Sequence, residues 1–532
     1  MTHLPRIAGL ALGLALLQGP LSPASRAESV LRMVPQADLR ILDPVWTTAT
    51  ITFNHSRLIY DTLYSMDSEL APQPQMVESH SASADKLTWR FTLRPGLKFH
   101  DGSPVTSADV IQSLKRWIQR SPDGKIISER TASLEPDGER GFVLALKQSY
   151  GMVIESLAGA ALMPFMMRKK DAETDAFTEM KESIGSGPYR FLREAWVPGS
   201  MVAYAKNKDY VPRSDPPDGA SGGKVVKVDR VEWPYIPDPG TALAALQRGE
   251  VDMLEVITHD MIPILERDPN IALLIIDPIG FQATIRPNHL VPPFNNPKAR
   301  QALFHIGTQQ DYLAAMVGQD PKYQRVCFSP FICGSPNESK AGIETVQKPD
   351  RETAKRLLKE GGYGGQPIVV MTPTDQPLIH TMTLVTAQFL REVGATVDLQ
   401  AMDWSTLLTR RVNKNDPATD RAGWNIAQTT WPGRIQQNPF TNLFASTSCD
   451  GRNSWGLPCD QEMERIRLSY IDATTQEERK RIIDALQRKF LEVVPYVPIG
   501  QFTRPIAYRK SLKGVVANSW DLALWNIEKT AN

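Results

Sequence analysis

The twelve residues FHDGSPVTSADV (99–110) combine a histidine, two aspartates and several turn-forming residues. Before them, LTWRFTL (87–93) has an apolar side chain at every second position, which is typical of a half-buried strand. Within the twelve residues an Asp-Gly pair favours a turn, and TSAD (106–109) has the spacing of a capping box at a helix start. From Val110, the last of the twelve, a helical apolar pattern begins and continues at Leu114. The stretch therefore predicts a strand–turn–helix joint, in which the histidine and the aspartates support the fold and perform no chemistry.

Length and charge limit the classes of protein to consider. The chain has 532 residues, which favours two or more domains around separate cores. Sixty basic residues balance fifty-nine acidic ones, and no polybasic run is present. Composition thus gives no reason to expect nucleic acid or an anionic membrane as partner. Strand and helix patterns alternate along the chain, which predicts an α/β or α+β fold.

The N-terminus resembles an export signal. An arginine precedes the apolar run IAGLALGLALL (7–17), and a Pro/Ser-rich stretch ends in SRA (25–27). This order predicts a signal peptide over residues 1–27, cleaved before Glu28. The run is shorter than the roughly 20 residues that span a bilayer, so a membrane anchor is the weaker interpretation. We expect the mature protein to be soluble and periplasmic.

The cysteines fit an oxidising compartment. Cys327 and Cys333 lie close together in the sequence, as do Cys449 and Cys459. Four cysteines allow three pairings, of which the two local loops, 327–333 and 449–459, are favoured in an exported protein. A four-thiolate zinc site is the alternative, but neither spacing is CxxC.

Sequence motifs of catalysis are missing. The chain contains no HExxH, GxSxG or complete P-loop, and its eight histidines are scattered without metal-ligand spacing. The glycines of GGYGG (361–365) follow a predicted helix and precede a strand, so helix termination explains them. We therefore expect no enzyme, no cofactor and no metal site.

Tryptophan and arginine gather between residues 401 and 433. Both side chains can line a pocket that binds apolar surface and carboxylates together. The alternative is that the tryptophans belong to the core and the arginines are solvated. The residues concerned are Trp404, Arg410, Arg411, Arg421, Trp424 and Trp431.

An ordered set of landmarks resembles one family along the whole mature chain. The landmarks are LDP (42–44), IYDTL (59–63), the stretch 87–117, GSGPY (185–189), NKDY (207–210), LQRGEVD (246–252), PFNNPKARQAL (293–303), AKRLL (354–358) with GY (362–363), and GW (423–424). On these landmarks the chain resembles the periplasmic solute-binding proteins of ABC importers in the peptide/nickel-binding class, extracellular solute-binding protein family 5.

The resemblance implies a two-lobed α/β fold with a hinge, of the type II-like cluster C, and an extra subdomain. The first lobe would comprise residues 28–70, 185–283 and 506–532, and residues 71–184 would form the extra subdomain attached to it. The second lobe would comprise residues 284–505. A ligand would be enclosed between the lobes and delivered to permease subunits by a monomeric carrier.

The resemblance also implies ligand-binding residues. A strand after the LDP motif would pair with a peptide backbone, and Trp404 with Arg411 would line side-chain pockets. Arg421 would meet a carboxylate beside Trp424, and the last crossing strand would face the cleft. The implied set comprises Trp46, Thr48, Thr50, Trp404, Arg411, Arg421, Trp424, Asn425, Ala427, Trp431, Gln501 and Phe502.

One position departs from the peptide-binding pattern. Peptide-binding members have an aspartate three residues after the tryptophan, where it pairs with the peptide α-ammonium, and this chain has Ala427 there. Because a buried ammonium without a counter-ion is costly, either another carboxylate such as Asp403 or Asp420 replaces it, or the ligand lacks a free α-amine. The segment has no histidine, so nickel is not favoured.

Several functions follow as hypotheses. The first is a periplasmic binding protein for a peptide or peptide-like solute. The second is the same carrier with a non-peptide ligand, such as an opine, a glycan fragment, haem or a metal chelate. An exported hydrolase on this scaffold, or a carrier that docks on a receptor instead of a permease, are further alternatives.

Overall fold

The computed structural model describes residues 1–2, 28–47, 49–159, 162–449, 455–473, 475–517 and 522–530, without the side chains of Pro122, Asp123 and Ser405. The predicted signal peptide lies outside these residues from position 3 to position 27, and so does Thr48. Within the described ranges, no helix has the length and apolar character needed to cross a membrane.

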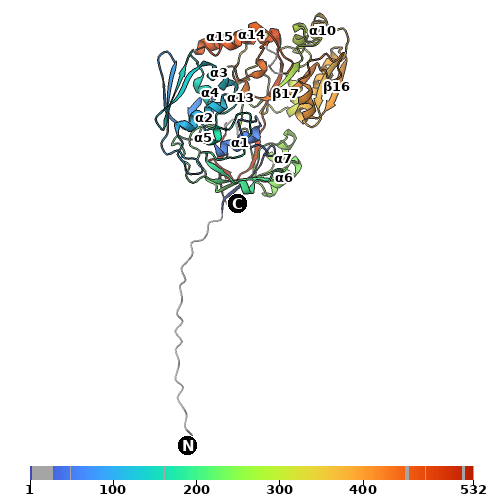
Figure 1. Ribbon diagram of the computed structural model, residues 1–532. Helices are drawn as coiled ribbons and strands as arrows, with labels where there is room; N and C mark the ends of the chain where they lie inside the picture. Colours follow the sequence, from blue (N-terminus) through green and yellow to red (C-terminus); the bar gives the residue numbers. More distant parts are fainter. Residues whose placement is uncertain are drawn as a thin grey trace.

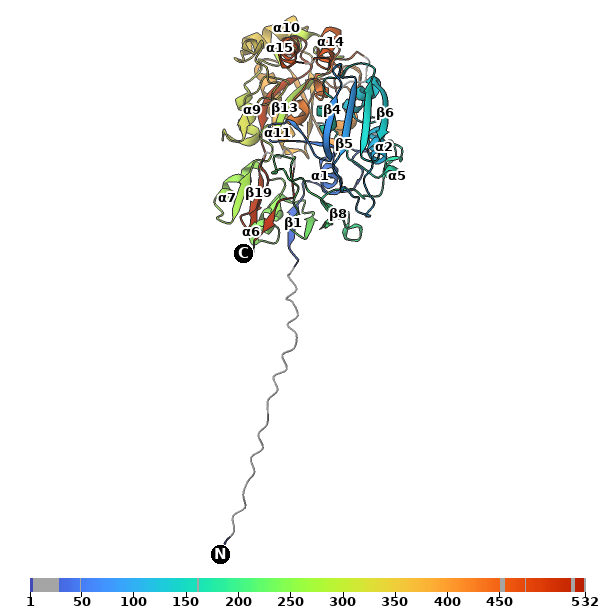
Figure 2. The ribbon, with the colours of Figure 1, turned by 90° about the vertical axis from the view of Figure 1, so that its left-hand side faces the viewer.

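A mixed sheet defines what we call the first unit, at the bottom of Figures 1 and 2. In the described residues it has seven strands, and the central β1 pairs in parallel with both β10 and β11. In spatial order the strands are β12 (Ile271–Leu274), β19 (Ile506–Arg509), β11 (Met253–Leu254), β1 (Val30–Val34), β10 (Arg230–Pro234), β9 (Met201–Lys206) and β8 (Tyr189–Phe191). Its helices are α1 (Thr50–Ile59), α6 (Pro239–Arg248) and α7 (Ile262–Glu266).

A second sheet defines the second unit. In the described residues it has six strands, and β15 pairs in parallel with β16 and β17. In spatial order these are β14 (Gln324–Arg325), β18 (Val497–Phe502), β13 (Phe281–Pro287), β17 (Ile426–Pro432), β15 (Ile368–Pro373) and β16 (Val397–Met402). Its helices are α8 (Pro297–Ala302), α9 (Gln309–Val317), α10 (Arg351–Glu360), α11 (Pro377–Glu392), α12 (Trp404–Arg410), α13 (Gly433–Gln436), α14 (Gln461–Ser469) and α15 (Gln476–Val493).

An antiparallel sheet marks the subdomain between residues 71 and 184. Figure 2 shows this sheet beside the second unit and above the first. Its strands are β4 (Val77–Ala82), β5 (Thr88–Leu93), β7 (Gly141–Leu146) and β6 (Thr131–Asp137). Its helices are α2 (Ser107–Trp117), α3 (Pro122–Arg130), α4 (Val153–Ala158) and α5 (Lys169–Ala172). The pairs β2 (Tyr64–Met66) with β3 (Pro72–Pro74), and β20 (Leu512–Lys513) with β21 (Glu528–Lys529), complete the strands of the described residues.

The 99–110 stretch forms the predicted strand–turn–helix joint between β5 and α2. The Asp109 carboxylate accepts hydrogen bonds from the backbone N–H of Thr106 (2.9 Å) and of Lys169 (2.7 Å), so it caps α2 and holds a distant loop. His100 accepts a hydrogen bond from the Gly185 N–H at 3.3 Å and contacts the Gly187 carbonyl at 3.1 Å. These contacts confirm the structural role predicted for the histidine.

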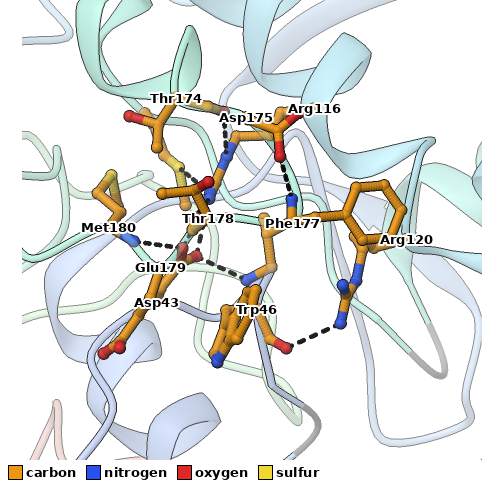
Figure 3. A network of polar contacts seen from close by, with 12 residues as sticks. Asp43, Trp46, Arg116, Arg120, Thr174, Asp175, Phe177, Thr178, Glu179 and Met180 are labelled. Carbon is orange, nitrogen blue, oxygen red and sulfur yellow. Dashed lines mark hydrogen bonds and ion pairs between the residues drawn. The ribbon is translucent and has the colours of Figure 1, made fainter.

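A buried ion pair attaches α2 to the first segment of the chain (Figure 3). The Arg116 guanidinium donates to both carboxylate oxygens of Asp43, at 3.0 and 2.6 Å, and it donates further to the carbonyls of Thr174 and Thr178. The two side chains are 1% and 0% exposed. The charge of Asp43, in the LDP motif, is therefore neutralised inside the protein by a residue of the subdomain.

Apolar packing links the subdomain to the second unit as well. Buried side chains of the subdomain, such as Phe91 and Trp117, belong to the same cluster as Ile285 and Phe490 of the second unit. The first unit has separate clusters on its sheet. The subdomain therefore contacts both units. One of them is the first unit, which corresponds to the lobe to which the resemblance attaches it.

Two segments pass between the two units. Residues 275–280 connect β12 to β13, and residues 503–505 connect β18 to β19. The predicted lobe boundary at residue 283 falls inside β13, because this strand already pairs with β17 from Phe281 onward. The predicted boundary between residues 505 and 506 coincides with the start of β19.

Both disulfides have the predicted local pairing. Cys327 is bonded to Cys333, and Cys449 to Cys459. Among the described residues no group of three or more His, Cys, Asp or Glu side chains could hold a metal ion.

Candidate ligand-binding site

The predicted segment rich in tryptophan and arginine, residues 401–433, contains helix α12 and strand β17 of the second unit. Trp424 and Ala427 are both 0% exposed and pack with Leu407 in a small apolar cluster. Trp404 is half-buried at the first position of α12 and packs against the same cluster. Trp404, Trp424 and Ala427 therefore lie in one apolar cluster, next to Val369 and Met371 of β15.

A chain of aromatic rings continues from this cluster. Trp404 lies 6.1 Å from Trp455, and Trp455 lies 6.1 Å from Phe444, measured between ring centroids. Phe444 in turn lies 4.6 Å from the predicted residue Trp431 and 6.2 Å from Tyr496. Trp404 and Trp431 come from one segment of the chain and Phe444 and Trp455 from a later one, and all four rings belong to or pack against the apolar clusters of the second unit.

Two arginines lie against these rings. The Arg411 guanidinium carbon lies 3.9 Å from the centroid of Trp455, and that of Arg286 lies 4.0 Å from the centroid of Phe444. Arg286 is 0% exposed, and its Nη2 donates to the Trp455 carbonyl at 2.8 Å. Cation–π contacts of this kind are favourable and strengthen when the pair is desolvated.

Both guanidinium groups have donors without acceptors. In the described part of the chain, no hydrogen-bond partner is found for Nε and Nη1 of Arg286 or for Nε of Arg411. Burial lowers the pKa of Arg286 to about 9, and the positive charge of Arg411 acts in the same direction. Burial also lowers the pKa of Arg411 to about 10. Both side chains remain cationic at neutral pH, so the cluster is positively charged.

Other predicted residues of the second unit have structural partners. Asn425 is 1% exposed, and its amide bonds the Val369 N–H and the Pro292 carbonyl. Gln501 is 2% exposed and bonds the backbone of Cys333 and of Ile279, so it holds the first disulfide loop to the crossing segment.

Two further predicted residues lie apart from the aromatic cluster. Phe502 is buried and stacks on Phe281 with ring centroids 5.7 Å apart. Arg421 has an exposed side chain, and its carbonyl accepts a hydrogen bond from Arg410. The structure therefore does not place Arg421, Gln501 or Phe502 beside the aromatic rings.

The predicted residues near the LDP motif have other surroundings. Figure 3 shows Trp46 beside Arg120, which donates to the Trp46 carbonyl at 3.0 Å and lies 5.5 Å from its ring centroid. Thr50 is the first residue of helix α1, so the prediction that it lies in a strand is wrong. Ala49 caps this helix in an extended conformation, and the apolar residues that follow have helical spacing. Thr50 lines a small cavity of about 120 Å³ together with Phe281 and Arg504.

A larger cavity of about 910 Å³ lies between the second unit on one side and residues of the first unit and the subdomain on the other. Met66, Leu70 and Met152 line one side, and Gln437, Asn438, Thr441 and Tyr470 line the other. Arg479 closes one edge, because its guanidinium donates to the Gly151 carbonyl at 2.9 Å and pairs with Glu155 at 3.3 Å. The volume lies in the range of small-molecule sites, roughly 300–1,000 Å³.

Sequence reasoning missed Arg286, Phe444 and Trp455. Arg286 is the one charged residue in the buried strand FQATIRP, and this pattern is a signal that could have marked it. Trp455 lies between the paired cysteines Cys449 and Cys459, where a large aromatic residue is equally conspicuous. None of these three residues lies near Trp404 in the sequence, so only the fold brings them close to it.

The sequence matches a known family over most of its length. Residues 71–453 match the middle part of the bacterial extracellular solute-binding proteins, family 5. The chain belongs to this family. Members of family 5 are solute-binding proteins and not enzymes, which confirms the resemblance inferred from the landmarks and the expectation that the chain is not an enzyme.

Relatives of this family 5 protein cover nearly all of it. A probable peptide ABC transporter periplasmic-binding protein of Sinorhizobium fredii is 40% identical over 531 residues, which are 98% of each chain. The glutathione-binding protein of Pectobacterium atrosepticum is 27% identical over 487 residues, covering 89% of this chain and 88% of that one. The crystal structure of the ABC transporter substrate-binding protein CtaP of Listeria monocytogenes matches with a TM-score of 0.79 and 19% identity, over 95% of this chain and 100% of that one. The last match confirms the predicted two-lobed fold.

Proposed function

We propose that the chain is the periplasmic binding component of an ABC importer and that it captures a peptide or a peptide-like solute. The observation that carries this proposal is the aromatic and cationic cluster around Trp404, Arg411 and Trp455 in a chain of this family. The 40% identical relative named for peptide transport, and the relative named for glutathione binding, support the same ligand class.

The ligand would bind between the two units. In this proposal the first unit, residues 28–70, 185–280 and 506–532, closes on the second unit about the two crossing segments. Aromatic side chains would cover the apolar parts of the ligand, since rings bury large areas at a small cost in side-chain entropy. Unpaired guanidinium donors would bind its acceptors. The closed form would then dock on permease subunits at the inner membrane as a monomer.

A non-peptide solute is the second candidate. Ala427 is buried at the position where the family resemblance places a counter-ion for a peptide ammonium, and no side-chain acceptor is supplied there by this residue. A solute without an α-amine would therefore fit this position as well as a peptide does.

Calorimetric titration tests the proposed function. The purified mature protein is titrated with a tripeptide library and a pentapeptide library, and separately with nickel–histidine, a glycan-fragment mixture and an opine mixture. We expect saturable binding of peptides and a rise in melting temperature, because a ligand that binds only the folded state stabilises it. Binding confined to the non-peptide solutes would support the second candidate, and no heat and no stabilisation with any of them would contradict both.

A further inference from the structure

Strand pairing places a cation, the Arg286 guanidinium, beside Ala427, the position at which the family resemblance places the ammonium of a bound peptide. Arg286 in β13 pairs directly with Ala427 in β17 in the antiparallel register. Side chains at directly opposite positions point to the same face of a sheet, about 4.5–5.5 Å apart at Cβ. The guanidinium of Arg286 therefore extends on the face that carries Ala427, and the small side chain of the alanine leaves it room.

Among the described residues, the Arg286 guanidinium has no carboxylate as counter-ion. In the described ranges neither Arg286 nor Arg411 forms an ion pair with a carboxylate, and Arg286 uses one of its three nitrogens on the Trp455 carbonyl. The partial charges of Phe444 and Tyr496, with guanidinium–centroid distances of 4.0 and 5.7 Å, compensate the charge in part. Buried donors without acceptors are destabilising, so an acceptor from outside the chain would be favoured here.

Charge determines which ligand group fits. An ammonium beside Ala427 would meet the positive charges of Arg286 and Arg411 with no carboxylate among the described residues to offset them. A carboxylate would instead receive two parallel hydrogen bonds from a guanidinium edge, the geometry in which arginine binds it best. The rings of Phe444 and Trp455, which lie against Arg286 and Arg411, come from outside the strands of the second sheet.

We propose that Arg286, assisted by Arg411, binds a carboxylate of the ligand beside Ala427, so that this carrier selects peptide-like solutes by an anionic group and not by a free α-ammonium. This inference rests on the proposed function and specifies its ligand class. The carboxylate can be the C-terminus of a peptide or an acidic side chain, and both present the same chemistry to the arginine.

Four tripeptide libraries separate these sources in calorimetric titrations with the wild-type protein. One has free ends and neutral side chains, one is N-acetylated, one is C-terminally amidated, and one is amidated with glutamate at a fixed position. We expect N-acetylation to change the affinity less than threefold and amidation of the neutral library to weaken it about tenfold or more. Recovery of affinity in the glutamate library would identify a side-chain carboxylate as sufficient, and no recovery would identify the C-terminus.

Variants assign the effect to the arginine. Arg286→Gln should lose the difference between free and amidated libraries, while Arg391→Gln, at an exposed arginine of α11, should keep it. If Arg286→Gln does not fold, the comparison of the four libraries with the wild-type protein still tests the inference. Arg286→Lys can then replace it, because this variant retains the charge without the bidentate geometry. Tight binding that requires a free N-terminus and ignores amidation would overturn this inference and leave the proposed function intact. No binding of any library would overturn both.

Discussion

His100 shows how one side chain of the 99–110 stretch supports the fold. Its Nδ1 accepts a hydrogen bond from Gly185 and its Nε2 donates to the Gly187 carbonyl, which requires the neutral ring. Burial lowers the pKa of His100 to about 4. The histidine therefore joins the β5–α2 turn to the GSGPY landmark, and two separate sequence stretches form one structural contact.

The stability of the protein should depend on pH through His100. Its pKa is lower in the folded state than the ordinary value of 6.5, so below pH 6.5 the unfolded chain binds a proton that the folded chain does not bind until about pH 4. The free energy of unfolding should fall as pH falls through this window. Between pH 7 and pH 4, we expect the free energy of unfolding of His100→Gln to fall by about 2 kcal/mol less than that of the wild type. Urea unfolding at both pH values measures this, and equal losses in the two proteins would contradict it.

The sequence could predict those residues of the candidate site that lie close together in the chain. Trp404, Trp424, Arg411 and Trp431 are visible as an aromatic and basic segment, because they are close in the chain. Arg286 reaches the same place only through the pairing of β13 with β17, and long-range pairing has no signal in a single sequence. The environment of Gln501 was unpredictable for the same reason, since its partners Cys333 and Ile279 come from distant segments.

Helix α2 is attached to the first unit by the Arg116–Asp43 ion pair. Removing one partner of a buried pair leaves an uncompensated charge and costs about 3–5 kcal/mol. We therefore expect Arg116→Met to lower the free energy of unfolding by that amount. Arg90→Met is the matched control, because the Arg90–Asp137 pair of the same subdomain is exposed and should contribute less than about 1 kcal/mol. Equal effects in a urea titration would refute the assignment.

Elements with strong periodicity were predictable and their boundaries were less so. The alternating stretch 87–93 forms strand β5, and the helix predicted before the GGYGG glycines is α10. The boundaries of α14 and α15 follow from Asp460 and Thr475, each of which caps a helix. Helix α1 begins at Thr50, where the family resemblance implied a strand.

Contacts across the large cavity join the subdomain to helix α15, at the top of Figure 1. Arg479 of α15 bonds Gly151 and Glu155, and close to this helix in the sequence Asp472 pairs with Arg130 of the subdomain at 2.7 Å. If the units separate about the crossing segments as proposed, the contacts that close this edge favour the closed form. A carrier with a smaller closed population binds its ligand with proportionally lower apparent affinity.

Removing the Arg479 contacts at this edge of the cavity should therefore reduce the affinity for peptide more than it reduces the free energy of unfolding. We expect Arg479→Met to reduce peptide affinity about three- to tenfold and to increase the radius of gyration of the ligand-free protein, while the free energy of unfolding changes by less than about 1 kcal/mol. Arg481→Met, at an exposed position of the same helix, should change neither quantity. X-ray scattering and calorimetry make the comparison, and unchanged affinity with an unchanged radius would show that the edge does not control closure.

The most direct test of the proposed function is the identity of the molecule that the protein carries from its own compartment. The protein is purified from the periplasm without denaturation, weighed intact by native mass spectrometry, then denatured so that the released ligand can be fragmented. We predict one peptide or peptide-like molecule per chain, with at least one free carboxylate. A ligand-free protein that gains no ligand when incubated with periplasmic extract, or a bound solute without a carboxylate, would contradict this account.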